Sequence, residues 1–367
     1  MIRELKAFGN FVVRSSRTAV LEPLHQLPKL EHLVYEVTDR CNSKCVHCNI
    51  WQNKGTGDMS DAEIERIFSS GAFRHLNDVI ITGGEPVLRS GIVANMAAIH
   101  GNVTPDAQFS LSTNGLLPER VLEATRKCLE RGMRLIVGVS LDGLNERHDA
   151  ARGVKGNFGK VDGLLKSLIR MREESGNDKL TVTVGYTLSP KTAGNLNEVA
   201  DYVCNLGLRF LPQMFEEFEY YSNSAPGNFS YFADGTEDAR ESAQVMLKAL
   251  ETIPPSFQKE LFLTLLDRGQ FPFKCASLRS FFLLRSNGDV TPCLRYSETR
   301  IGNLRETPLE EIWHSKKMEE ARVMVDNCRG CSNTWATGWS MRYWMPPFFR
   351  LLAAATIKKR LGGRRAA

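Results

Sequence analysis

Three cysteines in one short segment are the residues whose types and spacing point most directly to chemistry. Cys41, Cys45 and Cys48 fall within eight residues, directly after an apolar run. In a loop, three thiolates can turn towards one metal site, whereas a structural zinc or a fully ligated iron–sulfur cluster needs four ligands. The spacing therefore favours a cluster with one open iron. A zinc site completed by His47 is the main alternative, and three reduced cysteines without a metal are the least favoured interpretation.

The segments around these cysteines alternate between strand-like and helix-like patterns. Short apolar runs rich in Val, Ile, Leu and aromatic residues are typical of buried parallel strands, and they occur at 32–38, 78–82, 108–112, 134–140, 179–188 and 208–214. Helical patterns lie between them, at 60–71, 91–100, 118–131, 158–174 and 193–206. Such repeats predict an α/β fold with a parallel sheet, either doubly wound or curved into a barrel. In both cases, polar motifs should gather at the carboxyl ends of the strands.

Polar motifs do follow these strands in chain order. Their candidate site residues are Gly83, Gly84, Glu85, Ser112, Asn114, Ser140, Asp142 and Arg152. Each motif is weak by itself, but the cysteine segment and the motifs together resemble the radical S-adenosylmethionine (radical SAM) superfamily over roughly residues 33–214. The resemblance implies a partial (βα)6 barrel, which decides between the two sheet arrangements.

The resemblance also implies a set of cofactor contacts. The cysteine loop would hold a 4Fe–4S cluster whose open iron binds S-adenosylmethionine, and the cofactor would be cleaved to a 5′-deoxyadenosyl radical that takes a hydrogen atom from a substrate. The motif ending at Glu85 would take the methionyl amino group. Ser140 and Asp142 would face the ribose, and Arg152 would face the methionyl carboxylate. A zinc-binding protein or a non-catalytic protein of the same fold is the alternative function.

Further cysteines lie beyond the predicted barrel, namely Cys275, Cys293, Cys328 and Cys331. The first two flank a predicted hairpin with its turn at 286–289, and a predicted helix at 308–325 precedes the last pair. This arrangement resembles the SPASM/twitch extension of radical SAM proteins, in the shorter twitch form. The resemblance implies one auxiliary 4Fe–4S cluster, with a zinc site as the alternative. Cys128 and Cys204 lie in predicted helices, where free cysteine commonly packs as a small hydrophobe, and neither receives a role.

Composition limits the class of protein and the partners. The 367-residue chain is 42% hydrophobic and 24% charged, with a net charge of +5, which is ordinary for a globular protein and too mild to indicate nucleic-acid binding. Without a signal sequence or an apolar span of ~20 residues, a cytoplasmic protein is expected. The resemblance implies an external one-electron donor such as flavodoxin or ferredoxin. The expected substrate is a peptide or a small metabolite such as a sugar alcohol, and a separate peptide-binding protein is a further candidate partner.

The expected domain organisation has five parts. They are an N-terminal helix and linker (1–30), the barrel (31–214), a lid or linker with helices (215–270), the auxiliary-cluster domain (271–335) and an aromatic, basic tail (336–367). The aromatic and acidic segment at 215–234 is read equally as a substrate lid or as a solvated loop. The tail is either an interfacial helix that contacts anionic lipid or, in the favoured interpretation, a helix packed against the barrel.

Overall fold

The computed structural model describes residues 30–53, 57–174, 178–215, 237–252, 257–268, 273–328, 331 and 333–341. The expectations for the N-terminal helix, for most of the aromatic and acidic segment and for the basic end of the tail lie outside these residues. Within the described part, no helix is long and apolar enough to cross a membrane.

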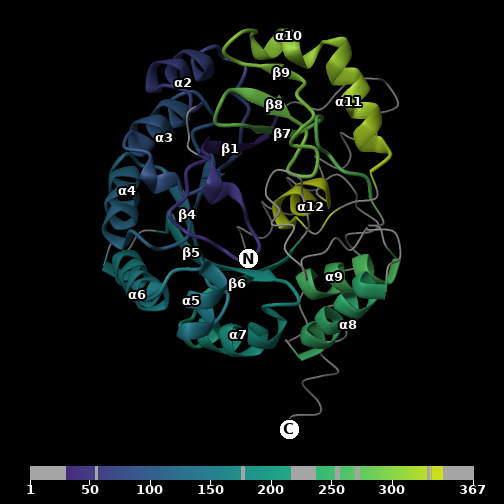
Figure 1. Cartoon of the computed structure of the whole chain (residues 1–367). Coiled ribbons are helices and arrows are strands. Elements are labelled where there is room, and N and C mark those ends of the chain that lie inside the picture. The colour runs from purple at the N-terminus through teal and green to yellow at the C-terminus, as the bar shows by residue number, and fades with distance from the viewer. Residues whose placement is uncertain are drawn as a thin grey trace.

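Six parallel strands form the barrel portion of the sheet. They are β1 (His32–Thr38), β2 (Asp78–Gly83), β3 (Gln108–Thr113), β4 (Arg134–Ser140), β5 (Leu180–Leu188) and β6 (Arg209–Met214). Each strand is hydrogen-bonded to the next in chain order, and the sheet curves inside an outer layer of helices (Figure 1). The predicted strands and the α/β class are confirmed, with boundaries that differ by at most one residue.

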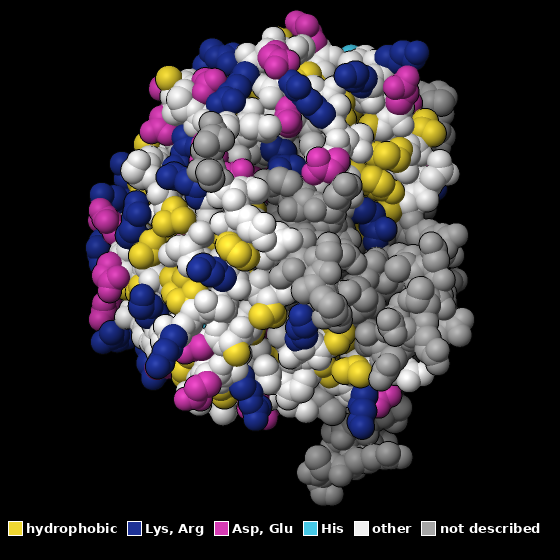
Figure 2. Space-filling view, in the orientation of Figure 1, with side chains coloured by type: hydrophobic (Ala, Val, Ile, Leu, Met, Phe, Trp, Pro, Cys, Tyr) yellow, Lys and Arg dark blue, Asp and Glu magenta, His cyan; other side chains and the backbone are white. Residues whose placement is uncertain are grey.

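The outer layer contains α2 (Asp61–Phe68), α3 (Ile92–His100), α4 (Pro118–Glu130), α5 (Glu146–Arg152), α6 (Asn157–Glu174), α7 (Leu196–Asn205), α8 (Glu237–Thr252) and α9 (Phe257–Arg268). Single 3-10 turns lie at η1 (Ile50–Gln52), η2 (Pro86–Leu88) and η3 (Ala193–Asn195). The sequence did not predict α5, because its seven mostly polar residues carry no apolar stripe. On the face seen in Figure 2, basic side chains are interspersed with acidic ones.

The strands bury one face against these helices and leave the other face towards the barrel interior. In β3, Phe109 and Leu111 are completely buried, whereas Ser110 and Ser112 line an interior cavity. The same alternation continues in β4, where Ser140 lines the cavity. Because side chains alternate between the two faces of a strand, the small residues Ser110, Ser112, Gly138 and Ser140 face the interior of these two strands and leave space there.

A C-terminal extension continues the same sheet. Its strands are β7 (Phe281–Leu284), β8 (Asp289–Thr291) and β9 (Gly302–Asn303). The predicted hairpin is β7–β8, and β7 also pairs in parallel with β1. An ion pair of 2.7 Å between Arg285 and Glu36 reinforces this junction. The barrel and the extension are therefore one nine-stranded sheet.

The helix expected at 308–325 is two helices, which corrects the prediction. They are α10 (Leu309–Trp313) and α11 (Lys316–Asp326). Ser315 stands between them, and its hydroxyl accepts a 3.1 Å hydrogen bond from the Met318 amide. A serine in this N-cap position starts a new helix. The apolar pattern therefore runs through both helices, although the backbone is interrupted between them. A last helix, α12 (Thr334–Met341), lies within the ring formed by the other helices (Figure 1).

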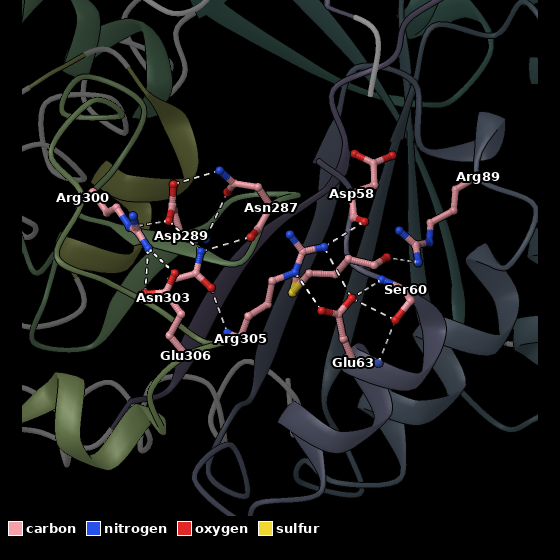
Figure 3. Close-up of polar contacts among 11 residues, drawn as sticks. Asp58, Ser60, Glu63, Arg89, Asn287, Asp289, Arg300, Asn303, Arg305 and Glu306 are labelled. Atoms are coloured by element: carbon pink, nitrogen blue, oxygen red, sulfur yellow. Dashed lines mark hydrogen bonds and ion pairs between the residues drawn. The ribbon is translucent and has the colours of Figure 1, made fainter. Parts of the chain in front are cut away.

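A polar network fastens the extension to the barrel (Figure 3). Arg305 forms a 2.9 Å ion pair with Glu63 and donates to the Asp58 carbonyl at 3.0 Å. Glu63 also caps α2 by accepting from the Ser60 amide at 2.7 Å. The Asp58 carboxylate accepts from the Thr38 hydroxyl at 2.6 Å. The network thus reaches the end of β1, where the cysteine loop begins.

Candidate functional site

The cysteine loop leaves the carboxyl end of β1 and brings its three thiols to one cavity. Cys41, Cys45 and Cys48 all line this cavity, whose volume is about 300 Å³. The loop is anchored to the end of α5, because the Lys44 amide donates a 3.0 Å hydrogen bond to the Arg152 carbonyl. Residues far apart in the sequence therefore hold the three sulfurs on one side of the cavity.

The surroundings of these sulfurs fit a bound metal group. Burial raises the pKa of Cys41 to about 11 and that of Cys48 to about 12. A ligating thiol must lose its proton, and a bound cation supplies the charge that compensates for burial. Hydrogen-bond partners also contact the sulfurs: Ser43 Oγ lies 3.2 Å from Cys45 Sγ, and the side-chain amide nitrogen of Asn114 lies 3.8 Å from Cys41 Sγ. Three converging sulfurs with such partners are the donor set that an iron–sulfur cluster uses.

The backbone of the Gly-Gly segment forms part of the cavity wall and passes close to the start of the cysteine loop. The amide of Gly84 donates a 2.8 Å hydrogen bond to the Thr38 carbonyl. A Cβ atom on Gly84 would lie 2.0 Å from the Arg40 carbonyl oxygen, so only glycine fits there. Gly83 has a φ of +126°, a conformation that side chains rarely allow.

Replacing Gly84 with alanine is expected to lower the free energy of unfolding by about 3 kcal/mol or more, since backbone atoms must move to relieve the overlap. The matched control is Gly163→Ala in α6, where an added Cβ meets no atom within 4 Å. That change should raise the free energy of unfolding by about 0.5–1 kcal/mol, the usual difference between the two residues inside a helix. Denaturant unfolding of both metal-free variants measures the two effects. Equal stabilities would contradict the close approach.

Glu85 lies behind the cavity wall rather than on it. Its carboxylate accepts hydrogen bonds from the backbone amide of Asn114 at 2.7 Å and from the Thr113 hydroxyl at 2.9 Å. Burial raises its pKa to about 7, while these hydrogen bonds act in the opposite direction. Glu85 therefore ties the end of β2 to the end of β3 and positions Asn114, whose side chain reaches Cys41.

Arg152 joins the cavity to a buried carboxylate. Its guanidinium forms a 2.8 Å ion pair with Asp142 and lies 3.7 Å from Cys45 Sγ. Burial would raise the pKa of Asp142, but Arg152 holds it below the ordinary value. Asp142 also accepts from the Thr187 amide at 2.7 Å. Burial, followed by the charge of Arg152, lowers the pKa of His148 to about 4. The neutral imidazole can therefore accept a hydrogen bond at Nδ1 from the backbone amide of Asp142.

The cavity therefore separates the predicted site residues into two groups. Its wall includes Gly83, Gly84, Ser112, Asn114, Ser140 and Arg152, whereas Glu85 and Asp142 are bonded to the chain's own donors. Sequence reasoning missed further wall residues, namely Thr187, Gln213, Phe215 and Leu294. Thr187 and Gln213 stand near the carboxyl ends of β5 and β6, a position that could have identified them. Leu294 comes from the extension, and no local pattern indicates it.

The remaining predicted cysteines meet at a second cavity in the extension. Cys275, Cys293, Cys328 and Cys331 all line it. Burial raises the pKa of Cys275 to about 11 and that of Cys293 to about 12. Their convergence offers four sulfurs to one metal group, as a complete 4Fe–4S ligand set requires. In the residues that the structure describes, no group of three or more Cys, His, Asp or Glu side chains is arranged to hold a single metal ion.

The two cysteines without an assigned role lie elsewhere. Cys128 is fully buried in α4, with its sulfur 4.0 Å from that of Met96. Cys204 is exposed on α7. The expectation of a buried small hydrophobe thus holds for Cys128 and is wrong for Cys204.

Comparison with known families matches two segments of the chain. The model of the radical SAM superfamily matches residues 35–203, which contain the three-cysteine loop and the motifs after it. Residues 35–203 therefore form a radical SAM domain. The model of the SPASM iron–sulfur cluster-binding domain matches residues 275–332, which contain all four distal cysteines. The two domain models therefore imply S-adenosylmethionine and 4Fe–4S clusters as cofactors of this chain.

Individual relatives of this radical SAM chain differ in what they make. Fe-coproporphyrin III synthase of Methanosarcina barkeri is 31% identical, over 46% of this chain and 40% of the relative. The subtilosin biosynthesis protein AlbA of Bacillus subtilis is 24% identical, over 82% of this chain and 64% of the relative. A probable GTP 3′,8-cyclase of Methanococcus aeolicus is 27% identical, over 77% of this chain and 90% of the relative. The chain thus spans less than two thirds of the first two relatives, and the three names imply different substrates.

Solved structures share the fold of this chain. Native anSMEcpe with bound AdoMet and Cp18Cys peptide superimposes with a TM-score of 0.59 at 19% identity, covering 90% of this chain and 99% of that chain. SuiB of Streptococcus suis bound to the precursor peptide SuiA gives a TM-score of 0.57 at 18% identity, covering 83% of this chain and 69% of the SuiB chain. These similarities extend the shared fold from the barrel into the extension.

Proposed function

We propose that this chain reductively cleaves S-adenosylmethionine and abstracts a hydrogen atom from a peptide side chain held in the barrel. The observation that carries the proposal is the convergence of Cys41, Cys45 and Cys48 on a cavity that continues into the barrel interior. A cluster bound there would supply the electron that breaks the S–C5′ bond, and the 5′-deoxyadenosyl radical would then take the hydrogen atom.

The protein's own contribution is to hold and orient the cofactor. Cys41, Cys45 and Cys48 are the proposed ligands of the first cluster. Gly83 and Gly84 present backbone to the cavity, and the Ser112 and Ser140 hydroxyls face the same cavity, so these four residues are the proposed contacts of the methionyl and ribose groups. Arg152 offers a guanidinium to a carboxylate, with Asp142 keeping it in place. Glu85 and Asn114 act together: Glu85 accepts the backbone amide hydrogen of Asn114, and the side-chain amide of Asn114 contacts the Cys41 sulfur.

The barrel interior is the proposed place of the substrate. Its cavity has a volume of about 510 Å³ and shares wall residues with the cofactor cavity, among them Ser112, Ser140, Thr187 and Gln213. Ser and Thr hydroxyls and Gln amides alternate on its wall with apolar and charged side chains, and Trp335 and Trp339 contribute an aromatic part of the wall. Such a wall can hydrogen-bond a peptide backbone while an aromatic surface packs against its side chain. The choice of a peptide follows the peptides named with anSMEcpe and SuiB and the bacteriocin named with AlbA.

An auxiliary cluster completes the proposal. Cys275, Cys293, Cys328 and Cys331 would ligate all four irons of a second 4Fe–4S cluster. Helix α12 separates the two cavities: Trp335 and Trp339 face the barrel, while Ser340 lines the cysteine cavity. The second cluster would thus lie one helix away from the substrate and could accept its electron. An external protein such as flavodoxin or ferredoxin would reduce the first cluster.

Anaerobic reconstitution with iron and sulfide, followed by reduction with dithionite, tests this function. The protein should contain about eight irons per chain, the content of two 4Fe–4S clusters, and should convert S-adenosylmethionine to 5′-deoxyadenosine. Deuterium transfer into 5′-deoxyadenosine from a candidate peptide, but not from GTP or a sugar alcohol, would identify the substrate class. A fully loaded protein that forms no 5′-deoxyadenosine would refute the proposal.

A further inference from the structure

The auxiliary cysteine cavity contains a tyrosine whose hydroxyl is directed at a sulfur. Tyr296 lies in the loop between β8 and β9, lines the cavity and hydrogen-bonds to Cys328 through its side chain. We infer that Tyr296 tunes the reduction potential of the auxiliary cluster by donating this hydrogen bond to the Cys328 sulfur. The inference rests on the proposed function, because it requires a cluster at the four distal cysteines.

Three other hydroxyls on the cavity wall have their hydrogens engaged elsewhere. Ser277 donates to the Pro292 carbonyl at 2.6 Å. Thr337 donates to the Asn333 carbonyl at 2.8 Å. Ser340 lies 3.9 Å from Cys275 Sγ but only 2.6 Å from the Ala336 carbonyl, and one hydroxyl hydrogen serves the shorter bond. Tyr296 therefore differs from these three in giving its hydrogen to sulfur.

Sulfur contacts from the backbone are independent of the tyrosine ring. The amides of Arg295 and Tyr296 donate to Cys293, and the Ser277 amide lies 3.5 Å from Cys275 Sγ. These donors persist when a side chain changes. Replacing the Tyr296 ring hydroxyl thus removes one hydrogen bond to one ligand and leaves the backbone contacts in place.

The expected effect of the Tyr296 hydrogen bond on the reduction potential is electrostatic. Reduction adds an electron to the cluster, and a hydrogen bond to a ligand sulfur stabilises the more negative, reduced form. Loss of the Tyr296 hydroxyl should therefore lower the potential without removing iron. Since α12 lines this cavity with one face and the barrel cavity with the other, that potential would govern how readily the cluster takes an electron from the substrate.

The test uses the full chain with Cys41, Cys45 and Cys48 replaced by alanine, so that the auxiliary cluster titrates alone. In this background, Tyr296→Phe should retain about four irons. Redox titration followed by electron paramagnetic resonance should show the ratio of reduced to oxidised cluster falling about two- to tenfold at a fixed potential, the range expected for one hydrogen bond. A tenfold change corresponds to about 59 mV for one electron.

The matched control is Thr337→Val, which removes a hydroxyl from the same cavity wall without removing a bond to sulfur. Its potential should equal that of the parent. An unchanged potential in fully loaded Tyr296→Phe would overturn the inference, and so would an equal shift in Thr337→Val. Loss of iron from Tyr296→Phe would overturn it in favour of a structural role. A parent without any second cluster would refute the auxiliary cluster itself, and this inference with it.

Discussion

Replacing Cys41, Cys45 and Cys48 together with alanine should abolish 5′-deoxyadenosine formation while leaving about four irons per chain, those of the remaining 4Fe–4S cluster. The three sulfurs line one cavity and offer the only ligands that the proposal gives to the first cluster. Without them, no iron is available to bind S-adenosylmethionine or to pass it an electron. The expected fall in activity is therefore complete rather than partial.

Iron analysis and chromatographic detection of 5′-deoxyadenosine measure this effect. The control is Cys204→Ala, which removes an exposed cysteine that lines neither cavity. It should retain about eight irons and full cleavage. Continued 5′-deoxyadenosine formation by the triple variant would rule out the assignment of the first cluster to this loop.

Replacing Cys328 and Cys331 with alanine should halve the iron content, from about eight to about four per chain. The variant should still cleave S-adenosylmethionine, because the first cavity keeps its three cysteines. If the auxiliary cluster takes the substrate electron, product formation should stop after hydrogen abstraction. Comparing 5′-deoxyadenosine with product by mass spectrometry separates the two steps.

The same variant should loosen only part of the extension. Strand β7 is hydrogen-bonded to β1, and Arg305 holds the hairpin to α2 and its preceding segment, so these elements have anchors besides the metal. The end of α11 and helix α12 lie next to the cysteines and should lose amide protection in hydrogen exchange. The cysteine triple variant, with the same iron content, is the control and should keep that protection. One tightly bound zinc and only four irons in the wild type would replace the auxiliary cluster with a structural zinc site.

Local pattern was sufficient for much of the barrel. The apolar runs that become β1 to β6 are each a few residues long and are bounded by turns or helices. Ser60 and Glu63 give a capping box at the start of α2, because both partners lie within one helical turn. The cysteine spacing indicated a metal site for a similar reason, since its three ligands lie on one loop.

Contacts between distant segments were decided by the tertiary structure. The pairing of β7 with β1 joins residues about 250 positions apart and turns two predicted units into one sheet. The position of Ser315 divides an apolar pattern that periodicity alone reads as one helix. In the site, Glu85 and Asp142 are directed to Asn114 and Arg152, which a motif cannot indicate because it does not specify where a side chain points.

The sequence by itself therefore determined the six barrel strands and the three-cysteine loop, because apolar runs and ligand spacing are properties of neighbouring residues. The barrel arrangement and the grouping of the four distal cysteines followed from the family resemblance. The tertiary structure decided which side chains face the cofactor cavity, which ones brace its wall, and which face of α12 meets each cavity. These features depend on burial and on hydrogen-bond partners supplied by other elements. A buried carboxylate or hydroxyl bonds to whichever donor or acceptor the fold brings within reach, and that is fixed only when the chain has folded.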